Sequence, residues 1–114
     1  MQILFILNDP PYGTERSYNG LRLAKALIKE GVNLTVFLMA DAVACAKRGQ
    51  QVPQGFFNIE LMLKSVLRNG QVLTCGTCLD ARGLSVEDLV EGAERSTMQV
   101  LSQHTIQADK VLVF

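Results

Sequence analysis

The stretch ILFIL at residues 3–7 decides the fold class, because it is apolar at every position rather than at every second one. Continuous apolar runs are typical of parallel strands that are buried on both faces. In strands with one solvent-exposed face, apolar and polar residues alternate. Three further runs of this kind follow, at LTVFLM (34–39), QVLTC (71–75) and KVLVF (110–114). We therefore expect four buried, parallel strands.

The segments between the first three runs have helical periodicity. Apolar residues at i, i+3, i+4 and i+7 share one face of a helix, and two segments carry such stripes: Leu21, Ala24, Leu27 and Ile28, and then Ile59, Met62, Leu63, Val66 and Leu67. Gly31 is expected to end the first helix. Asn58 is expected to cap the second helix, and Gly70 to end it.

The second half of the chain has weaker patterns. Ser85, with Asp88 three residues later, predicts a helix start, and 96–107 is a less regular helical segment. A short strand is expected near 92–95, and a short helix followed by a Gly/Pro loop within 41–57. Strands that alternate with helices predict a three-layer α/β/α fold with a mostly parallel, doubly wound sheet of four to five strands.

Length and composition indicate one domain, residues 1–114, with a core that needs no metal or disulfide to hold it. Lys and Arg number 11, as do Asp and Glu, so no net charge would attract nucleic acid or an anionic membrane. The mean hydropathy of +0.19 is high for a small protein and predicts apolar surface covered by other copies in a homo-oligomer.

The cellular compartment is expected to be the cytoplasm. The start, MQILFILND, lacks the basic region and cleavage site of a signal peptide, and no apolar run is long enough to cross a membrane. In a reducing compartment, a pair of nearby cysteines indicates redox, sulfur or metal chemistry more often than a structural disulfide.

The carboxyl ends of the predicted strands are where an open parallel sheet gathers its functional groups. Four stretches fall there: NDPPYGTERS (8–17), ADAV (40–43), CGTCLDARG (75–83) and the turn near Glu91–Arg95. The third contains Cys75 and Cys78, so the sequence places a CxxC pair at the ligand-binding edge.

If this pair carries out thiol chemistry, the two cysteines are expected to have different roles. Cys75 ends a rigid strand and is the candidate nucleophile, because Arg82 and a helix starting at Ser85 would favour its thiolate. Cys78 is a natural second thiol, since it can attack a persulfide or mixed disulfide formed on Cys75.

Alternative interpretations remain open from the residues alone. Both cysteines could be inert core residues, or line a pocket or interface of a non-catalytic oligomeric binding module for a small ligand or protein. A dithiol redox protein is a further alternative, although such sites usually open a helix with their CxxC, whereas Asp80–Gly83 indicates a turn. Structural zinc needs four ligands, and Cys45 and His104 are the only further soft candidates. No metal site is therefore expected.

The remaining candidates are interpreted structurally. Cys45 is expected to be a small core residue, and His104 a surface or interface residue. An acidic cluster of Asp9, Asp41 and Asp80 would suit a phospho-acceptor domain, but a thiol stands where the acceptor would be. The stretch PPYGTERS reads as a strand–helix turn, and no nucleotide-binding motif occurs.

In these stretches the sequence resembles the DsrE/DsrF-like sulfur-relay family, in its YchN-like branch. The matching segments run through the whole chain in order: PYG (11–13), LRLAKAL (21–27), VFLMADAV (36–43), RGQ (48–50), FNIELML (57–63), CGTCLDARG (75–83) and ADKVLVF (108–114). The resemblance implies a small α/β/α domain that assembles into compact oligomers, often hexamers, and here a hexamer or a trimer.

The family also implies a function. Several members carry sulfane sulfur as a cysteine persulfide, and the position of the carrying cysteine matches Cys75. The expected activity is sulfurtransferase-like, with Cys75, Cys78 and Arg82 as the reactive group and no organic cofactor. Donor and acceptor proteins would be the partners. Pocket or supporting roles are expected for Asn8, Tyr12, Asp41, Arg48, Asp80 and Gly83, with loops 8–17 and 48–58 as walls.

Overall fold

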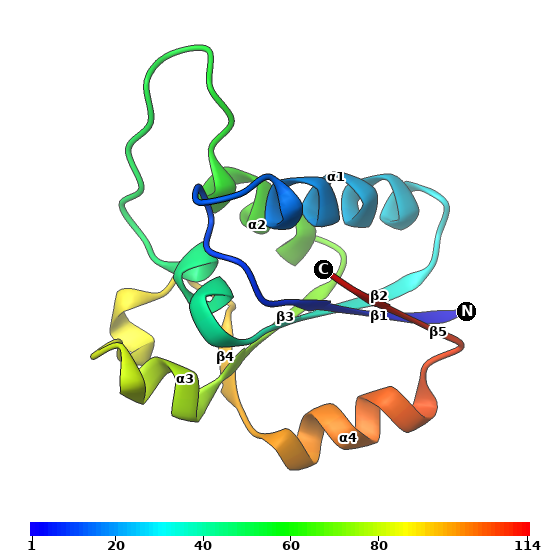
Figure 1. The fold of residues 1–114 in the computed structure, drawn as a ribbon. Helices are drawn as coiled ribbons and strands as arrows, with labels where there is room; N and C mark the ends of the chain where they lie inside the picture. The colour runs from blue at the N-terminus through cyan, green and yellow to red at the C-terminus, as the bar shows by residue number, and fades with distance from the viewer.

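One five-stranded parallel sheet lies between two layers of helices (Figure 1). The structure is a computed structural model that describes residues 1–114. Its elements in chain order are β1 (Gln2–Leu7), α1 (Arg16–Lys29), β2 (Asn33–Leu38), the 3₁₀ helix η1 (Ala40–Ala46), α2 (Ile59–Leu67), β3 (Gln71–Cys75), α3 (Gly76–Ala81), the 3₁₀ turn η2 (Val86–Asp88), β4 (Glu94–Ser96), α4 (Met98–Gln107) and β5 (Lys110–Val113).

The strand order is β4-β3-β2-β1-β5, and every neighbouring pair is parallel. Helices α1 and α2 cover one face, while α3 and α4 lie on the other (Figure 1). The chain therefore winds in one direction from β1 to β4, and α4 then carries it back across the sheet to β5. This arrangement confirms the predicted doubly wound α/β/α fold.

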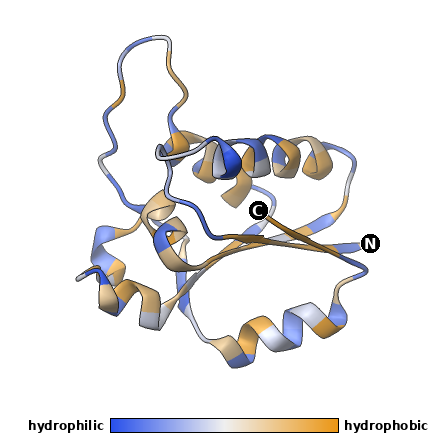
Figure 2. Cartoon of the chain, viewed as in Figure 1, coloured by the Kyte–Doolittle hydropathy of each residue, from blue (hydrophilic) through white to orange (hydrophobic).

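The three central strands form the core, as their continuous apolar runs predict. Nearly every residue of β1, β2 and β3 after the first is buried, and Phe5 and Phe37 are fully enclosed. Figure 2 shows the same concentration of apolar residues along the strands. The edge strand β5 differs, because Val111 and Val113 are 40% and 61% exposed. A strand at the edge of the sheet can have the same continuous apolar sequence as a buried central strand, so the sequence did not show that β5 is exposed.

Two local predictions were wrong in the region that carries the cysteines. Asp80 belongs to helix α3 rather than to a turn, because the chain enters that helix directly after Cys75. Conversely, Ser85 starts only the three-residue turn η2, although the predicted capping contact exists: the backbone N–H of Ser85 donates to the Asp88 carboxylate at 2.9 Å. The cap was identified correctly, but no apolar stripe follows it to sustain a helix.

The connection after β2 contains the 3₁₀ helix η1 and then a long loop that projects from the rest of the chain (Figure 1). The loop returns at Asn58, whose side chain accepts a hydrogen bond from the backbone N–H of Leu61 at 3.1 Å, as the predicted N-cap of α2. None of the helices has the length and apolar character needed to cross a membrane.

Candidate functional site

Cys75 and Cys78 lie where the connections of two neighbouring strands part. The chain leaves β2 through η1 toward α2 on one face, whereas it leaves β3 straight into α3 on the other face (Figure 1). Open α/β sheets bind their ligands at such divergence points. The backbone N–H of Ala40, at the start of the β2 connection, donates to the Cys78 Sγ at 3.2 Å. The CxxC pair therefore bridges the two diverging connections.

Helix α3 begins immediately after the first thiol. Cys75 occupies the N-cap position with φ −62° and ψ 116°, and its Sγ lies 3.2 Å from the Thr77 hydroxyl oxygen. Its side chain is almost buried, with 7% of the residue exposed, whereas Cys78 is half-buried. The CxxC motif thus opens a helix directly, which removes the reason for ranking a dithiol site low.

The two thiols have opposite pKa shifts. Burial alone would raise the pKa of Cys75, but hydrogen bonds from the Cys78 thiol, the Thr77 hydroxyl and the backbone N–H groups of both residues outweigh it, and the pKa falls below its ordinary 9.0. The pKa of Cys78 is raised above 9.0, first because this thiol donates to Cys75 and second because of burial. Cys75 therefore ionises first, and Cys78 keeps its proton.

Ala40 holds a backbone conformation that non-glycine residues rarely adopt. Its φ is 51°, in the left-handed region, which costs about 1 kcal/mol or more for a residue with a side chain. This conformation occurs where the Ala40 N–H contacts the Cys78 sulfur. Strained backbone of this kind clusters at functional sites, and here it adjoins the thiol pair.

Arg82 lies at the far end of α3 and is bound to two partners. Its guanidinium contacts the Asp41 carboxylate at 3.0 and 2.9 Å and donates to the backbone carbonyl oxygen of Cys78 at 3.0 Å. These contacts fasten the end of α3 to η1. The Arg82 charge makes a small contribution that lowers the pKa of Cys78, whereas the lowered pKa of Cys75 comes from hydrogen bonds.

A different cation, Arg95, lies next to the first cysteine. Parallel pairing with β3 sets Arg95 level with Thr74, one residue before Cys75. The guanidinium makes two hydrogen bonds to the Asp80 carboxylate, at 2.9 and 2.8 Å, and lies over Gly76. The turn near Glu91–Arg95 was expected at this edge of the sheet, but Arg95 was not among the predicted site residues. The position of Arg95 in that turn was the only feature of its own sequence context that could have suggested a role at the site.

Other predicted support residues stabilise the surrounding chain. The backbone and side-chain amides of Asn8 donate to the Phe114 carbonyl oxygen at 3.0 and 3.1 Å, which fastens the end of β1 to the C-terminus. Gly83, with φ +66°, takes the left-handed position just past α3 that suits glycine. The Nε of Arg48 donates to the Leu89 carbonyl oxygen at 3.0 Å. These contacts are structural.

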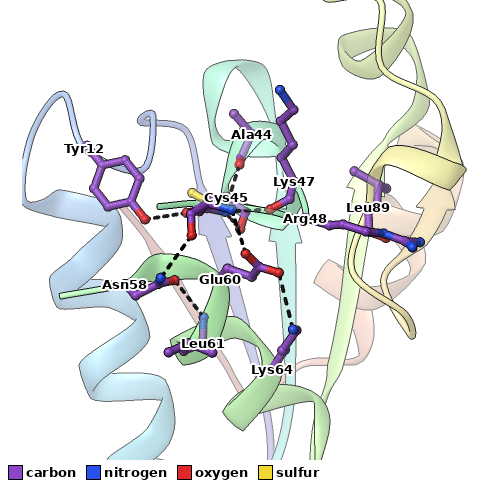
Figure 3. Close-up of polar contacts among 11 residues, drawn as sticks. Tyr12, Ala44, Cys45, Lys47, Arg48, Asn58, Glu60, Leu61, Lys64 and Leu89 are labelled. Carbon is purple, nitrogen blue, oxygen red and sulfur yellow. Dashed lines mark hydrogen bonds and ion pairs between the residues drawn. The ribbon is translucent and has the colours of Figure 1, made fainter. Parts of the chain in front are cut away.

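Gln50 is the centre of the polar network at the base of the projecting loop. Figure 3 shows its partners Tyr12, Asn58 and Glu60 pointing toward this network. Its side-chain amide donates to the carbonyl oxygens of Cys45 and Lys47 at 3.0 and 2.9 Å and accepts from the Tyr12 hydroxyl. Its backbone N–H donates to Glu60 at 2.8 Å, so both ends of the loop meet at one residue. In the sequence, Gln50 stands only within the RGQ stretch (48–50), and no local pattern marks it as the centre of this network.

The loops expected to wall a thiol pocket do meet, but elsewhere. They enclose a hollow of about 400 Å³ whose lining includes Tyr12, Val52, Pro53, Phe56 and Phe57 and neither thiol of the CxxC pair. Tyr12 and Tyr18 stack on Phe57, with ring centroids 5.8 and 4.0 Å away, and this stacking draws the loop toward the start of α1 and away from β3.

The third cysteine and the only histidine are separate from the site. Cys45 is fully buried, and burial raises its pKa to about 12, so its thiol is inert at neutral pH. His104 lines a hollow with Gln2 and Asn33, which begin β1 and β2, at the opposite end of the sheet. No three His, Cys, Asp or Glu side chains lie together in an arrangement that could hold a metal ion.

Comparison with known proteins gives one consistent result. A model of the DsrE/DsrF-like family matches residues 1–114. Protein YchN of Escherichia coli K12 is 44% identical, with 99% of this chain and 98% of the relative covered, and its crystal structure superposes with a TM-score of 0.92 over 100% of both chains. An uncharacterized protein of Methanocaldococcus jannaschii is 38% identical over the full length of both. A TusC homolog of Vibrio parahaemolyticus is 26% identical over 99% of this chain and 98% of its own.

Proposed function

Because the chain belongs to the DsrE/DsrF-like family, we propose that it is a sulfur-relay protein that carries sulfane sulfur as a persulfide on Cys75. One observation carries the proposal: Cys75 ends β3 at the opening of α3, where the Cys78 thiol, the Thr77 hydroxyl and two backbone N–H groups favour its thiolate. The thiol is nearly buried, but among polar donors. The similarity to a TusC homolog supports a role in sulfur relay.

The transfer step needs only the two thiols and a donor. The Cys75 thiolate attacks the terminal sulfur of a donor persulfide, R–S–SH; the new bond joins that sulfur to Cys75 Sγ, and the donor leaves as R–S⁻. The product, Cys75–S–SH, keeps the donor's proton and ionises readily. Cys78 enters as the hydrogen-bond donor that keeps Cys75 ionised before attack.

Intact mass measurement after loading tests the proposal. The reduced protein is incubated with inorganic polysulfide, freed of excess reagent and weighed, and a gain of about 32 Da per chain is expected for one sulfur atom. Cys75→Ser should gain nothing, whereas the matched Cys45→Ser variant should load like the parent. A Cys75→Ser protein that still gains the added mass would show that Cys75 is not the acceptor.

A dithiol redox protein is the second candidate, and the direct opening of α3 by the CxxC motif favours it. In that role Cys75 and Cys78 lose two electrons and two protons to an oxidant such as glutathione disulfide and form one S–S bond. The mass falls by about 2 Da, against the gain of about 32 Da on sulfur loading. A protein that closes this disulfide with glutathione disulfide but never retains added sulfur would be assigned to this second function.

We further propose that copies of the chain assemble, as a hexamer or trimer, and that the assembly works in the cytoplasm with donor and acceptor proteins. Exposed apolar side chains on the edge strand β5 and on α4 support self-association: Val113 is 61% exposed and Ile106 is 82% exposed. Light scattering is expected to give three or six times the chain mass of 12.5 kDa. A monomer at micromolar concentration would contradict the assembly.

A further inference from the structure

Gly76, the residue after the reactive thiol, leaves a space that one guanidinium fills. A Cβ at this position would lie 2.8, 2.9 and 3.0 Å from the Nε, Cζ and one terminal nitrogen of Arg95. Real Cβ atoms essentially never come within 3.0 Å of another atom, so a side chain at this position would displace the guanidinium, which is the movable end of Arg95. The Arg95 guanidinium can therefore lie against the backbone next to Cys75 only because position 76 has no side chain.

A carboxylate on the same helix fixes the guanidinium there. Asp80, four residues after Gly76, accepts hydrogen bonds from both terminal nitrogens of Arg95 at 2.9 and 2.8 Å. Side chains four apart lie above one another on a helix, so Asp80 holds Arg95 over the first turn of α3. Two of the five guanidinium N–H groups face Asp80, and three remain for another acceptor.

We propose that Arg95 is the cationic residue of the Cys75 site: it stabilises the thiolate and then the persulfide anion, with Gly76 and Asp80 as its positioning residues. The part that concerns the persulfide rests on the proposed function, whereas the part that concerns the thiolate does not. The pKa of Arg95 is raised first by Asp80 and, to a smaller extent, by the Cys75 thiolate. The lowered pKa of Cys75 itself comes from the hydrogen bonds of Cys78 and Thr77, so the role of Arg95 rests on its position against the backbone beside Cys75.

The charged and titratable groups around Cys75 come from three elements. Helix α3 contributes Cys78 and Asp80, β4 contributes Arg95, and η1 contributes Asp41, which is bound to Arg82. The negative charge of Asp80 disfavours a thiolate at Cys75, but Asp80 also positions Arg95, which favours that thiolate. An Asp80 variant would therefore change the pKa of Cys75 in two opposite directions at once. Variants at Gly76 and Arg95 therefore test the role of Arg95 more clearly than variants at Asp80.

The test measures how fast iodoacetamide alkylates Cys75 between pH 5 and pH 10 in the full chain, with the modified residue identified by peptide fragmentation. In Arg95→Gln the apparent pKa of Cys75 should rise by about half a unit to one unit, so that the rate at pH 6.5 falls about threefold to tenfold. Gly76→Ala should shift the pKa in the same direction, because the new Cβ displaces Arg95. Alanine is the better helix former, so this variant should keep or improve its stability.

Three controls separate the electrostatic effect from a structural one. Arg22→Gln removes an exposed cation on α1 and should leave the profile of Cys75 unchanged. The difference between the parent and Arg95→Gln should shrink in 1 M NaCl, since salt screens partly exposed charges. The double variant Gly76→Ala/Arg95→Gln should match Arg95→Gln alone, because Gly76 acts through Arg95.

Each outcome decides one point. A Cys75 profile that stays the same in Arg95→Gln and Gly76→Ala overturns the inference, and so do additive shifts in the double variant. Alkylation needs no sulfur transfer, so its result is independent of the loading experiment. A shifted profile in a protein that never retains sulfur upholds the role of Arg95 and rejects the carrier function. Normal loading with an unshifted profile rejects the role of Arg95 alone.

Discussion

At pH 7, iodoacetamide should alkylate Cys75 much faster than Cys45, by about a hundredfold or more. Burial raises the pKa of Cys45 to about 12, whereas the hydrogen bonds of the Cys78 and Thr77 groups bring the pKa of Cys75 below 9.0. A far larger fraction of Cys75 than of Cys45 is therefore thiolate at pH 7, and this outweighs the greater intrinsic nucleophilicity of a thiolate with a higher pKa. Because Cys45 is also fully enclosed, the reagent reaches it only when the chain opens.

The measurement is a competition within one sample. A small amount of reagent is added to the reduced protein, and the labelled peptides that contain Cys45 and Cys75 are quantified by mass spectrometry. Unfolding the protein in urea should bring the two rates close together, since the difference comes from the fold. Rates within tenfold of each other in the native protein would contradict the arrangement described for the site.

Gln50→Ala should lower the free energy of unfolding by about 2–3 kcal/mol. The side chain makes three good hydrogen bonds, to the Cys45 and Lys47 carbonyl oxygens and from the Tyr12 hydroxyl, and each contributes about 1 kcal/mol net. Their loss leaves polar groups of η1 without partners at the base of the loop. Urea denaturation monitored by circular dichroism gives the difference.

Gln51→Ala is the matched control, because this neighbouring glutamine is exposed. A change within about 0.5 kcal/mol is expected for that variant, as for ordinary surface positions. Equal effects at positions 50 and 51 would show that the loop is not held through the Gln50 side chain.

The sequence predicted the sheet because its signals are local. The apolar runs at 3–7 and 34–39 reflect burial on both faces, which only central parallel strands need. The N-cap of Asn58 and the Ser85–Asp88 contact were also found, since each involves residues only three apart. Local patterns therefore recovered the elements and the two cysteines at a strand end.

Features that depend on distant contacts could not be predicted in the same way. Helix α3 has six residues and opens with Gly76 and Thr77, so it contains no apolar stripe that would reveal it. Arg95 reaches the site from β4, and only the pairing of β4 with β3 brings it beside Cys75. Its sequence context resembles any polar turn. A glycine directly after a candidate nucleophile was the one local sign that something approaches closely there.

The central claim is that Cys75 ionises before Cys78, and an NMR titration of the protein with ¹³Cβ-labelled cysteine tests it most directly. Single cysteine-to-serine variants assign the three signals, and the ¹³Cβ shifts are then followed with pH. The first ionisation of the coupled pair should appear at Cys75, below its ordinary pKa of 9.0, and Cys78 should titrate above that value. A first ionisation at Cys78, or a Cys75 that titrates at or above 9.0, would contradict the account.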